Sequence, residues 1–280
     1  MNPEPRQQED YGDRQVEAAR RVLVDLGQVL ASFSDCIVLV GGWVPDLLLP
    51  DAPEPHVGSI DVDLALDAEK LKGGRYADLL KLLLDTRRYE LGTEHFQLVT
   101  KVDLQDGGEP VQVEVEFLAP KEVKLKKNRP KLLKDFRVLQ ADGCGVAFHA
   151  PVEMPLPGVN IRGDKNTVRL RLASLADFLV MKAHAIGGRD KPKDAYDFCY
   201  CLDYSPDGIG PLAADWKARL GERDISRAVE ILREKFEDPS FIGPQQVVEF
   251  YHSPQPEERE MQARRAYELV REFLKQIDDA

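Results

Sequence analysis

The sequence has 280 residues, of which 43% are hydrophobic and 31% are charged, and its formal net charge is −11. A chain of this length can bury one large core or two modest ones, and the mixture of charged and aromatic residues argues against disorder. The acidic balance excludes RNA binding by overall charge, so an RNA partner would need a local basic patch.

Membrane spans, secretion signals and disulfides are not expected. The first residues, MNPEPRQQEDYGDR, contain no apolar stretch, and no apolar run approaches the roughly 18 residues of a membrane helix. The cysteines show no CxxC spacing, so we expect reduced thiols in a cytoplasmic protein. They are Cys36, Cys144, Cys199 and Cys201.

The front of the sequence predicts alternating helices and strands. Apolar residues recur at helical spacing from Val16 to Phe33, and IVLV (37–40) is typical of a short buried strand. The pair Gly41-Gly42 ends this strand before a short helix over 43–49. The other elements predicted here are strands over 59–66, 95–102 and 111–118, a helix over 75–86, and short strands within 136–171.

The rear of the sequence predicts helices only. They lie over 174–187, over 192–203, as a pair between 208 and 237, and over 257–277. We therefore expect an α/β (α+β) protein. Its first domain, over 1–171, has a small mixed sheet and a basic β insertion at about 121–171. A helical domain over 172–280 follows.

Acidic residues on two predicted strands form a candidate metal site. Asp61 and Asp63 alternate with apolar residues and share one strand face, although aspartate is depleted from strands. Glu114 and Glu116 share a face in the same way. If the strands are neighbours, these carboxylates form a patch suited to Mg²⁺ and substrate phosphates. The alternative is two strands with a solvated polar face.

The glycine pair is a candidate phosphate site. Two glycines between a strand and a helix let backbone N–H groups approach an anion closely. A tight turn alone would also explain Gly41 and Gly42. Their position about twenty residues before Asp61 favours a combined nucleotide and metal site.

These motifs resemble those of a known superfamily. GGWVPDLLLP (41–50) followed by HVGSIDVDLAL (56–66) is similar to the DNA polymerase beta-type nucleotidyltransferases, in which a GG or GS turn precedes a DxD strand. VEVEFLAP (113–120) resembles their later strand that carries a third acid. LADFLVMKAHAIGGRDKPKDAYDFCYCL (175–202) resembles the AbiEii-type toxin branch. The GGW start is also similar to aminoglycoside and lincosamide nucleotidyltransferases.

The resemblance implies a nucleotidyltransferase that uses two Mg²⁺ ions and an NTP such as ATP, and transfers a nucleoside monophosphate to a hydroxyl. It makes 1–171 the catalytic domain and gives 172–280 a part in nucleotide binding. The implied catalytic and metal-binding residues are Asp61, Asp63 and Glu116, with Glu114 in reserve. The implied nucleotide-binding residues are Gly41, Gly42, Ser59, Lys182, Arg189 and Asp194, with less weight on Asp197.

Several of these residues have plainer interpretations. Lys182 is the one charge within the apolar stretch FLVMKAHAI, where a lysine either snorkels to solvent or becomes a desolvated cation near a triphosphate. Asp194 and Asp197 would otherwise form ion pairs that pack the helical domain. Trp43 departs from the family, because many members have Ser or Thr there. The residues His56, His95 and His149 are interpreted as structural.

The acceptor implied by the toxin branch is tRNA. Residues 121–137 contain eight basic and two acidic side chains, a net charge of +6 that could hold RNA locally. The alternative is a solvated lysine-rich face. Other hypotheses are a small hydroxyl compound such as an aminoglycoside as acceptor, and a non-catalytic nucleotide-binding homologue. A cognate antitoxin is a candidate partner, and no membrane partner is expected.

Overall fold

The computed structural model describes residues 4–72, 74–121 and 138–279. The chain divides into two compact units. The sheet unit contains 12–44 and 58–174, and the helical unit contains the described part of 1–11 together with 45–57 and 175–280. In the described residues, no helix has both the length and the hydropathy needed to cross a membrane.

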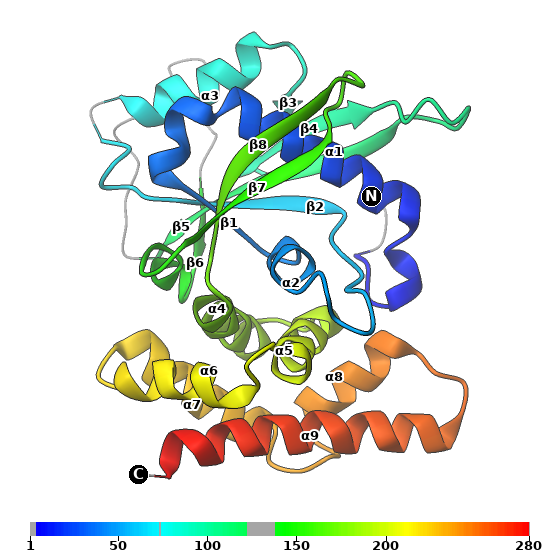
Figure 1. Cartoon of the computed structure of the whole chain (residues 1–280), viewed down its shortest axis with the longest axis vertical. Coiled ribbons are helices and arrows are strands. Elements are labelled where there is room, and N and C mark those ends of the chain that lie inside the picture. The colour runs from blue at the N-terminus through cyan, green and yellow to red at the C-terminus, as the bar shows by residue number, and fades with distance from the viewer. Residues whose placement is uncertain (1–3, 73, 122–137, 280) are drawn as a thin grey trace. The chain divides into compact units, whose positions relative to one another are not determined.

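The sheet unit is built on one mixed sheet (Figure 1). In the described residues its strand order is β3-β4-β5-β2-β1-β8-β7, with β6 paired to β5. The pairs β2–β5, β1–β8 and β5–β6 are parallel, and the others are antiparallel. The strands are β1 (Ile37–Val40), β2 (Asp61–Leu66), β3 (Glu90–Leu91), β4 (Gln97–Val102), β5 (Val111–Pro120), β6 (Leu139–Ala141), β7 (Val152–Val159) and β8 (Lys165–Leu172).

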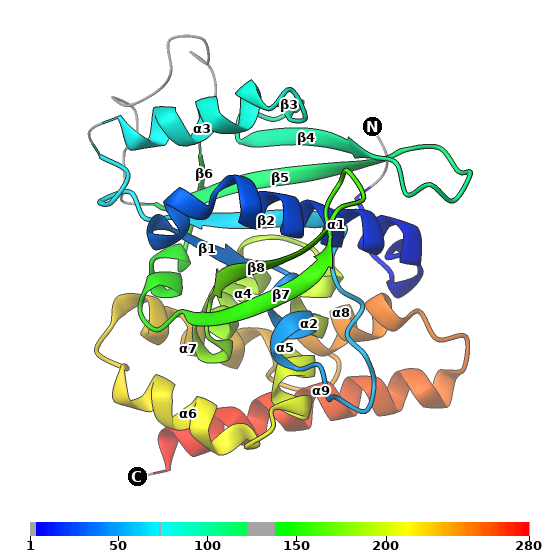
Figure 2. The same cartoon turned by 45° about the horizontal axis from the view of Figure 1, so that its top comes forward.

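Helix α1 (Asp13–Val29) covers one face of this sheet, as Figure 2 shows. Its Leu23 and Leu26 line the same small cavity as Leu64 of β2. Since side chains alternate along a strand, Asp61 and Asp63 lie on the opposite face. The other helices among the described residues of this unit are α3 (Arg75–Asp85) and the 3₁₀ helices Ala31–Cys36 and Cys144–Phe148.

Helix α2 (Trp43–Leu48) begins in the sheet unit and ends in the helical unit. The helical unit also contains a 3₁₀ helix, Gln8–Asp10. Phe198, Trp216 and Phe273 pack edge to face in its core, with ring centroids 5.0–6.4 Å apart. Its remaining helices are α4 (Leu175–Gly188), α5 (Pro192–Tyr204), α6 (Ile209–Ala218), α7 (Arg223–Lys235), α8 (Ile242–Tyr251) and α9 (Pro256–Asp278).

The structure confirms the mixed α/β class with a helical C-terminal region. Helix α8 was not among the predicted helices; its Pro244 lies in the first turn, where proline is well tolerated. The first helix ends at Val29 and not at Phe33, since a 3₁₀ helix follows. Residues 45–57 group with the helical unit, so neither unit is one continuous stretch of chain.

The structure also describes the four cysteines and one lysine of the basic segment. All four cysteines are buried. Of the basic segment 121–137, only Lys121 belongs to the described residues, where it forms an ion pair with Asp142. The other lysines of that segment, including Lys124, Lys126 and Lys127, lie outside the described part of the chain.

Candidate active site

Four carboxylates lie side by side on the face of the sheet opposite α1. The parallel pairing of β2 with β5 places Asp61 beside Glu114 and Asp63 beside Glu116. In-register residues of neighbouring strands point to the same face, and all four side chains are partly exposed. The sequence-based expectation that these acids share one patch therefore holds for the backbone positions.

Gln97 of β4 joins the two glutamates. Its Nε2 donates to Glu114 Oε2 at 2.9 Å and to Glu116 Oε1 at 2.8 Å, and the residue is buried. Gln97 is the cross-strand partner of Glu116, which explains its reach. Its own Oε1 is buried without a hydrogen-bond partner. The amide thus draws both carboxylates towards β4.

Gly41 lies directly against the carboxylate of Asp63. Its φ is +73°, in the left-handed region that favours glycine. A Cβ atom at this position would lie 2.0 Å from Asp63 Oδ2. The turn after β1 therefore requires glycine for its backbone conformation and for the room that Asp63 occupies. Gly42 is buried beside it.

Ser59 and Trp43 both hold Asp61. The Ser59 hydroxyl donates to Asp61 Oδ1 at 2.5 Å. The Trp43 indole N–H donates to the backbone carbonyl of Asp61 at 2.8 Å, and Trp43 is almost completely buried. Trp43 thus fixes the start of β2. This role gives the tryptophan a structural function beside the glycine turn.

The donor set on this face suits a divalent cation. Carboxylate oxygens from two adjacent strands are hard ligands of the kind that Mg²⁺ prefers, and the glycine turn gives the Asp63 carboxylate its room on this face. Within the described residues, no three His, Cys, Asp or Glu side chains are already grouped as a metal cage. The two glutamates are both hydrogen-bonded to Gln97.

The helical unit carries a second cluster of predicted residues. Lys182 of α4 contacts Asp194 Oδ1 and Asp197 Oδ2 of α5, both at 2.7 Å. Arg189 Nε donates to Asp194 Oδ2 at 2.7 Å. Lys193 donates to Asp197 Oδ1 at 2.7 Å. Lys182 therefore does not snorkel to solvent but is buried in an ion-pair network.

The charges in this cluster stabilise one another. Burial lowers the pKa of Lys182, but the carboxylates of Asp194 and Asp197 reverse this and raise it above its usual value. Burial likewise opposes ionisation of Asp194, yet Lys182 and Arg189 bring its pKa down to about 2. Both residues are therefore charged at neutral pH, and the network is an ion-pair set that also packs α4 against α5.

His56 completes this network. Its Nε2 lies 2.9 Å from Asp197 Oδ1, and both side chains are fully buried. Burial and the positive charge of Lys193 lower the pKa of His56 to about 4, so the imidazole is neutral and Nε2–H donates to the carboxylate. The interpretation of His56 as structural agrees with this position.

The predicted site residues fall into two sets. The sheet unit brings together Gly41, Gly42, Ser59, Asp61, Asp63 and Glu116, and the helical unit brings together Lys182, Arg189 and Asp194. Sequence reasoning missed Gln97. The alternation of EHFQLVT (94–100) places Gln97 on the face opposite Phe96 and Leu98. The turn QDGGEP (105–110) favours pairing of the two strands, but the register that sets Gln97 opposite Glu116 is not visible in the sequence.

A family model matches residues 24–276, and its description is "Nucleotidyl transferase AbiEii toxin, Type IV TA system". An antigenic nucleotidyltransferase-like protein from Paracoccidioides brasiliensis is 20% identical, with a TM-score of 0.39, over 76% of this chain and 93% of that one. JHP933 from Helicobacter pylori is 11% identical, with a TM-score of 0.44, over 95% and 94%. No curated protein matches the sequence.

Proposed function

Because the chain belongs to the AbiEii nucleotidyltransferase toxin family, we propose that it transfers a nucleoside monophosphate from an NTP to an acceptor hydroxyl, with release of pyrophosphate. The family match makes it a nucleotidyltransferase and favours an enzyme over a non-catalytic homologue. The single observation that carries the assignment of residues is the pairing of β2 with β5, which sets Asp61 and Asp63 beside Glu114 and Glu116.

In this proposal Asp61, Asp63 and Glu116 would hold Mg²⁺, with Glu114 as the alternative third acid. Bound Mg²⁺ supplies positive charge that lowers the pKa of a hydroxyl and neutralises a departing pyrophosphate. Glu116 orients the acceptor hydroxyl and accepts its proton. Ser59 and Trp43 keep Asp61 in place through its side chain and its backbone, respectively.

The turn at Gly41 and Gly42 would receive the phosphates of the NTP. Backbone N–H groups at a glycine turn can approach phosphate oxygens without a side chain between them. In the helical unit, Arg189 is half exposed, with 51% of its side chain accessible, and it stays a predicted nucleotide-binding residue. Asp194 holds the Arg189 guanidinium in position through an ion pair, and Lys182 contacts the same carboxylate.

We propose tRNA as the acceptor. Two features support an RNA: the toxin family, and the net charge of +6 on residues 121–137, which contrasts with the acidic remainder of the chain. Local basic segments grip RNA through its phosphates. A product of the neighbouring gene that neutralises toxicity would be the cognate antitoxin.

A labelling experiment tests this function. The protein is incubated with each α-phosphate-labelled NTP, Mg²⁺ and total tRNA, and transfer to RNA is followed on gels. Asp61→Asn should reduce transfer at least about 100-fold, since one carboxylate of the metal patch is lost. Asp85→Asn, an exposed acid of the same unit that pairs with Lys81, is the matched control and should stay active.

Three further outcomes bear on the proposal. Chelation of divalent cations should abolish transfer, and added Mg²⁺ should restore it. Equal activity of the Asp61→Asn protein would contradict the assignment of the site. The net charge of −11 favours a cationic small acceptor as a second candidate, so aminoglycosides are included as acceptors, and labelling of these alone would replace tRNA.

A further inference from the structure

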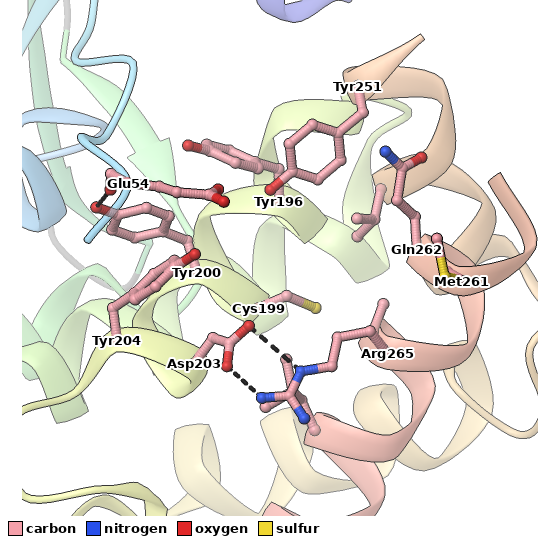
Figure 3. A pocket seen from close by; sticks show the side chains of 13 residues that line it. Glu54, Tyr196, Cys199, Tyr200, Asp203, Tyr204, Tyr251, Met261, Gln262 and Arg265 are labelled. Atoms are coloured by element: carbon pink, nitrogen blue, oxygen red, sulfur yellow. Dashed lines mark hydrogen bonds and ion pairs between the residues drawn. The ribbon is translucent and has the colours of Figure 1, made fainter. Parts of the chain in front are cut away.

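A cavity of about 390 Å³ lies within the helical unit (Figure 3). It is bounded by α5, α8, α9 and the segment 45–57, all of which belong to this one unit. Its volume falls in the range of small-molecule pockets, roughly 300–1,000 Å³. The residues proposed to carry nucleotidyl transfer do not line it. A ligand of this cavity would therefore bind at a site separate from those residues.

Tyrosine rings form one wall of this cavity. Tyr204 packs on Tyr200 with ring centroids 4.6 Å apart, and Tyr200 on Tyr196 at 5.7 Å. Tyr251 of α8 stands nearly perpendicular to Tyr196, with an interplanar angle of 87° and centroids 5.5 Å apart. The faces of such rings carry negative partial charge and attract cations.

The polar groups that line the cavity are mainly hydrogen-bond acceptors. Gln262 Oε1 is buried and has no hydrogen-bond partner. The Glu54 carboxylate points among the tyrosine rings (Figure 3), and burial together with its charge raises the pKa of Tyr251. The Tyr200 hydroxyl donates a hydrogen bond to the backbone oxygen of Glu54 at 2.6 Å, so its proton is not available to a ligand.

Among the described residues that line the cavity, the guanidinium of Arg265 is already neutralised. Arg265 of α9 forms an ion pair with Asp203 of α5, through both Nε and Nη2. Glu54 therefore leaves the lining with a net negative charge. A phosphate or carboxylate would meet no uncompensated cation here, which argues against nucleotides as occupants.

We propose that this cavity binds a small organic cation, an ammonium or guanidinium group on an apolar stem. The tyrosine rings surround the stem and face the charge, Glu54 balances it, and Gln262 Oε1 accepts a hydrogen bond from a ligand N–H. The same chemistry is offered by a free polyamine and by a lysine or arginine side chain of a partner protein. This inference does not depend on the proposed transfer reaction.

Choline and its neutral isostere 3,3-dimethylbutan-1-ol test the central point, with binding measured by calorimetry and by NMR shifts of tyrosine resonances. The full chain should bind choline with a Kd of about 1 mM or tighter, and the isostere at least about tenfold more weakly. Equal binding of the two probes, or no binding of choline at about 10 mM, overturns the proposal.

Variants assign the binding to this cavity. Glu54→Gln and Tyr204→Leu should each weaken choline binding about tenfold, whereas Tyr204→Phe, which keeps the ring, should retain it. Both positions are at least partly exposed, so the variants should fold, which circular dichroism checks. Glu237→Gln and Tyr267→Leu, which lie outside the lining, are the matched controls. Loss of binding in the controls but not in the cavity variants overturns the assignment.

Further arms separate the sources of the cation. Spermidine represents a free polyamine, and a short peptide with one central arginine represents a partner protein, with citrulline in its place as the neutral control. Binding of either cation over its neutral counterpart supports the proposal and names the source. Adenosine is the competing class, and if it binds more tightly than all the cations, the cavity is a nucleobase site instead.

Discussion

At the scale of single residues, Gly41 is the position on which Asp63 depends most directly. Gly41→Ala adds a Cβ atom 2.0 Å from Asp63 Oδ2 and strains a backbone with a φ of +73°. We expect nucleotidyl transfer to fall at least about 100-fold, because a displaced metal ligand loses its alignment with substrate. Rates with labelled NTP measure this.

Gly107→Ala provides the matched control for that prediction. Gly107 has a similar φ of +82°, but a Cβ atom there would meet nothing within 4 Å. The two variants therefore share the backbone penalty, about 1 kcal/mol, and differ in the steric clash with Asp63. Equal activity of the two would show that the contact between Gly41 and Asp63 has no part in catalysis.

Gln97 donates hydrogen bonds to both Glu114 and Glu116 and thereby stabilises two neighbouring carboxylates. Gln97→Glu replaces the donor amide by a third carboxylate beside Glu114 and Glu116. We expect the free energy of unfolding to fall by about 1–3 kcal/mol, because the partly buried carboxylates lose their donor and like charges are brought together. Urea unfolding measures this, and added Mg²⁺ should restore part of the loss by neutralising the carboxylates.

Gln112→Glu is the control for the added charge. Gln112 lies on the same strand face as Glu114 but is exposed to solvent. Its replacement should change the free energy of unfolding by less than about 0.5 kcal/mol. A Gln97→Glu protein as stable as the wild type would contradict the bridging role of the amide.

At the scale of elements, α4 and α5 are joined by the ion-pair network of Lys182, Asp194 and Asp197, and His56, which is bonded to Asp197, makes its stability depend on pH. The pKa of His56 is about 4 in the folded state, against 6.5 for an ordinary histidine, mainly because of burial. Between these two values the unfolded chain binds a proton that the folded chain does not. The free energy of unfolding should therefore decrease as the pH falls from about 6.5 to about 4, by up to about 3 kcal/mol.

Urea unfolding at a series of pH values measures this dependence. His56→Gln should flatten the curve between about pH 6.5 and about pH 4, although the variant is less stable at neutral pH. Below this window the carboxylate of Asp194, whose pKa is about 2, begins to lose its own stabilisation. His95→Gln, at an exposed position, is the control and should leave the slope unchanged.

The elements also show what the sequence can and cannot predict. Alternation in DVDLAL predicts β2 and its polar face, because the period of a strand is local information. The pairing of β2 with β5, which brings the acids together, joins segments about fifty residues apart and cannot be read from either one. The burial of Lys182 was equally undetermined, since its partners Asp194 and Asp197 become visible only once α4 and α5 pack.

At the scale of the whole molecule, charge is distributed unevenly along the chain. The segment 121–137 carries a net charge of +6 in a protein whose total is −11. Reversing Lys124, Lys126 and Lys127 to glutamate should weaken labelling of tRNA at least about tenfold at moderate salt, because fewer phosphate contacts form. Gel assays over a series of salt concentrations measure both the loss and its salt dependence.

The control for that prediction reverses lysines elsewhere. Lys70, Lys72 and Lys81 are exposed residues of the sheet unit, and their reversal to glutamate changes the net charge by the same amount. It should leave tRNA labelling close to the wild-type rate. If both triple variants lose activity equally, total charge and not this segment governs RNA binding.

The whole fold was less predictable than its parts. The sequence indicates where helices replace strands near residue 172, but the grouping of 45–57 with the helices depends on packing that no periodicity encodes. His56 illustrates this, because its partner Asp197 lies 141 residues further along the chain. The family resemblance was enough to predict the site residues. The structural roles of Gln97 and Trp43 follow only from their hydrogen bonds in the folded protein.

The two tryptophans provide built-in optical probes of the two units. Trp43 lies in the sheet unit, hydrogen-bonded to the Asp61 carbonyl, and Trp216 lies in the helical unit, hydrogen-bonded to the Ala176 carbonyl at 3.0 Å. Both are buried, and the sequence contains no others. A Trp216→Phe protein thus emits tryptophan fluorescence from beside the carboxylate patch alone. Intrinsic fluorescence can therefore time events at the candidate active site without any attached label.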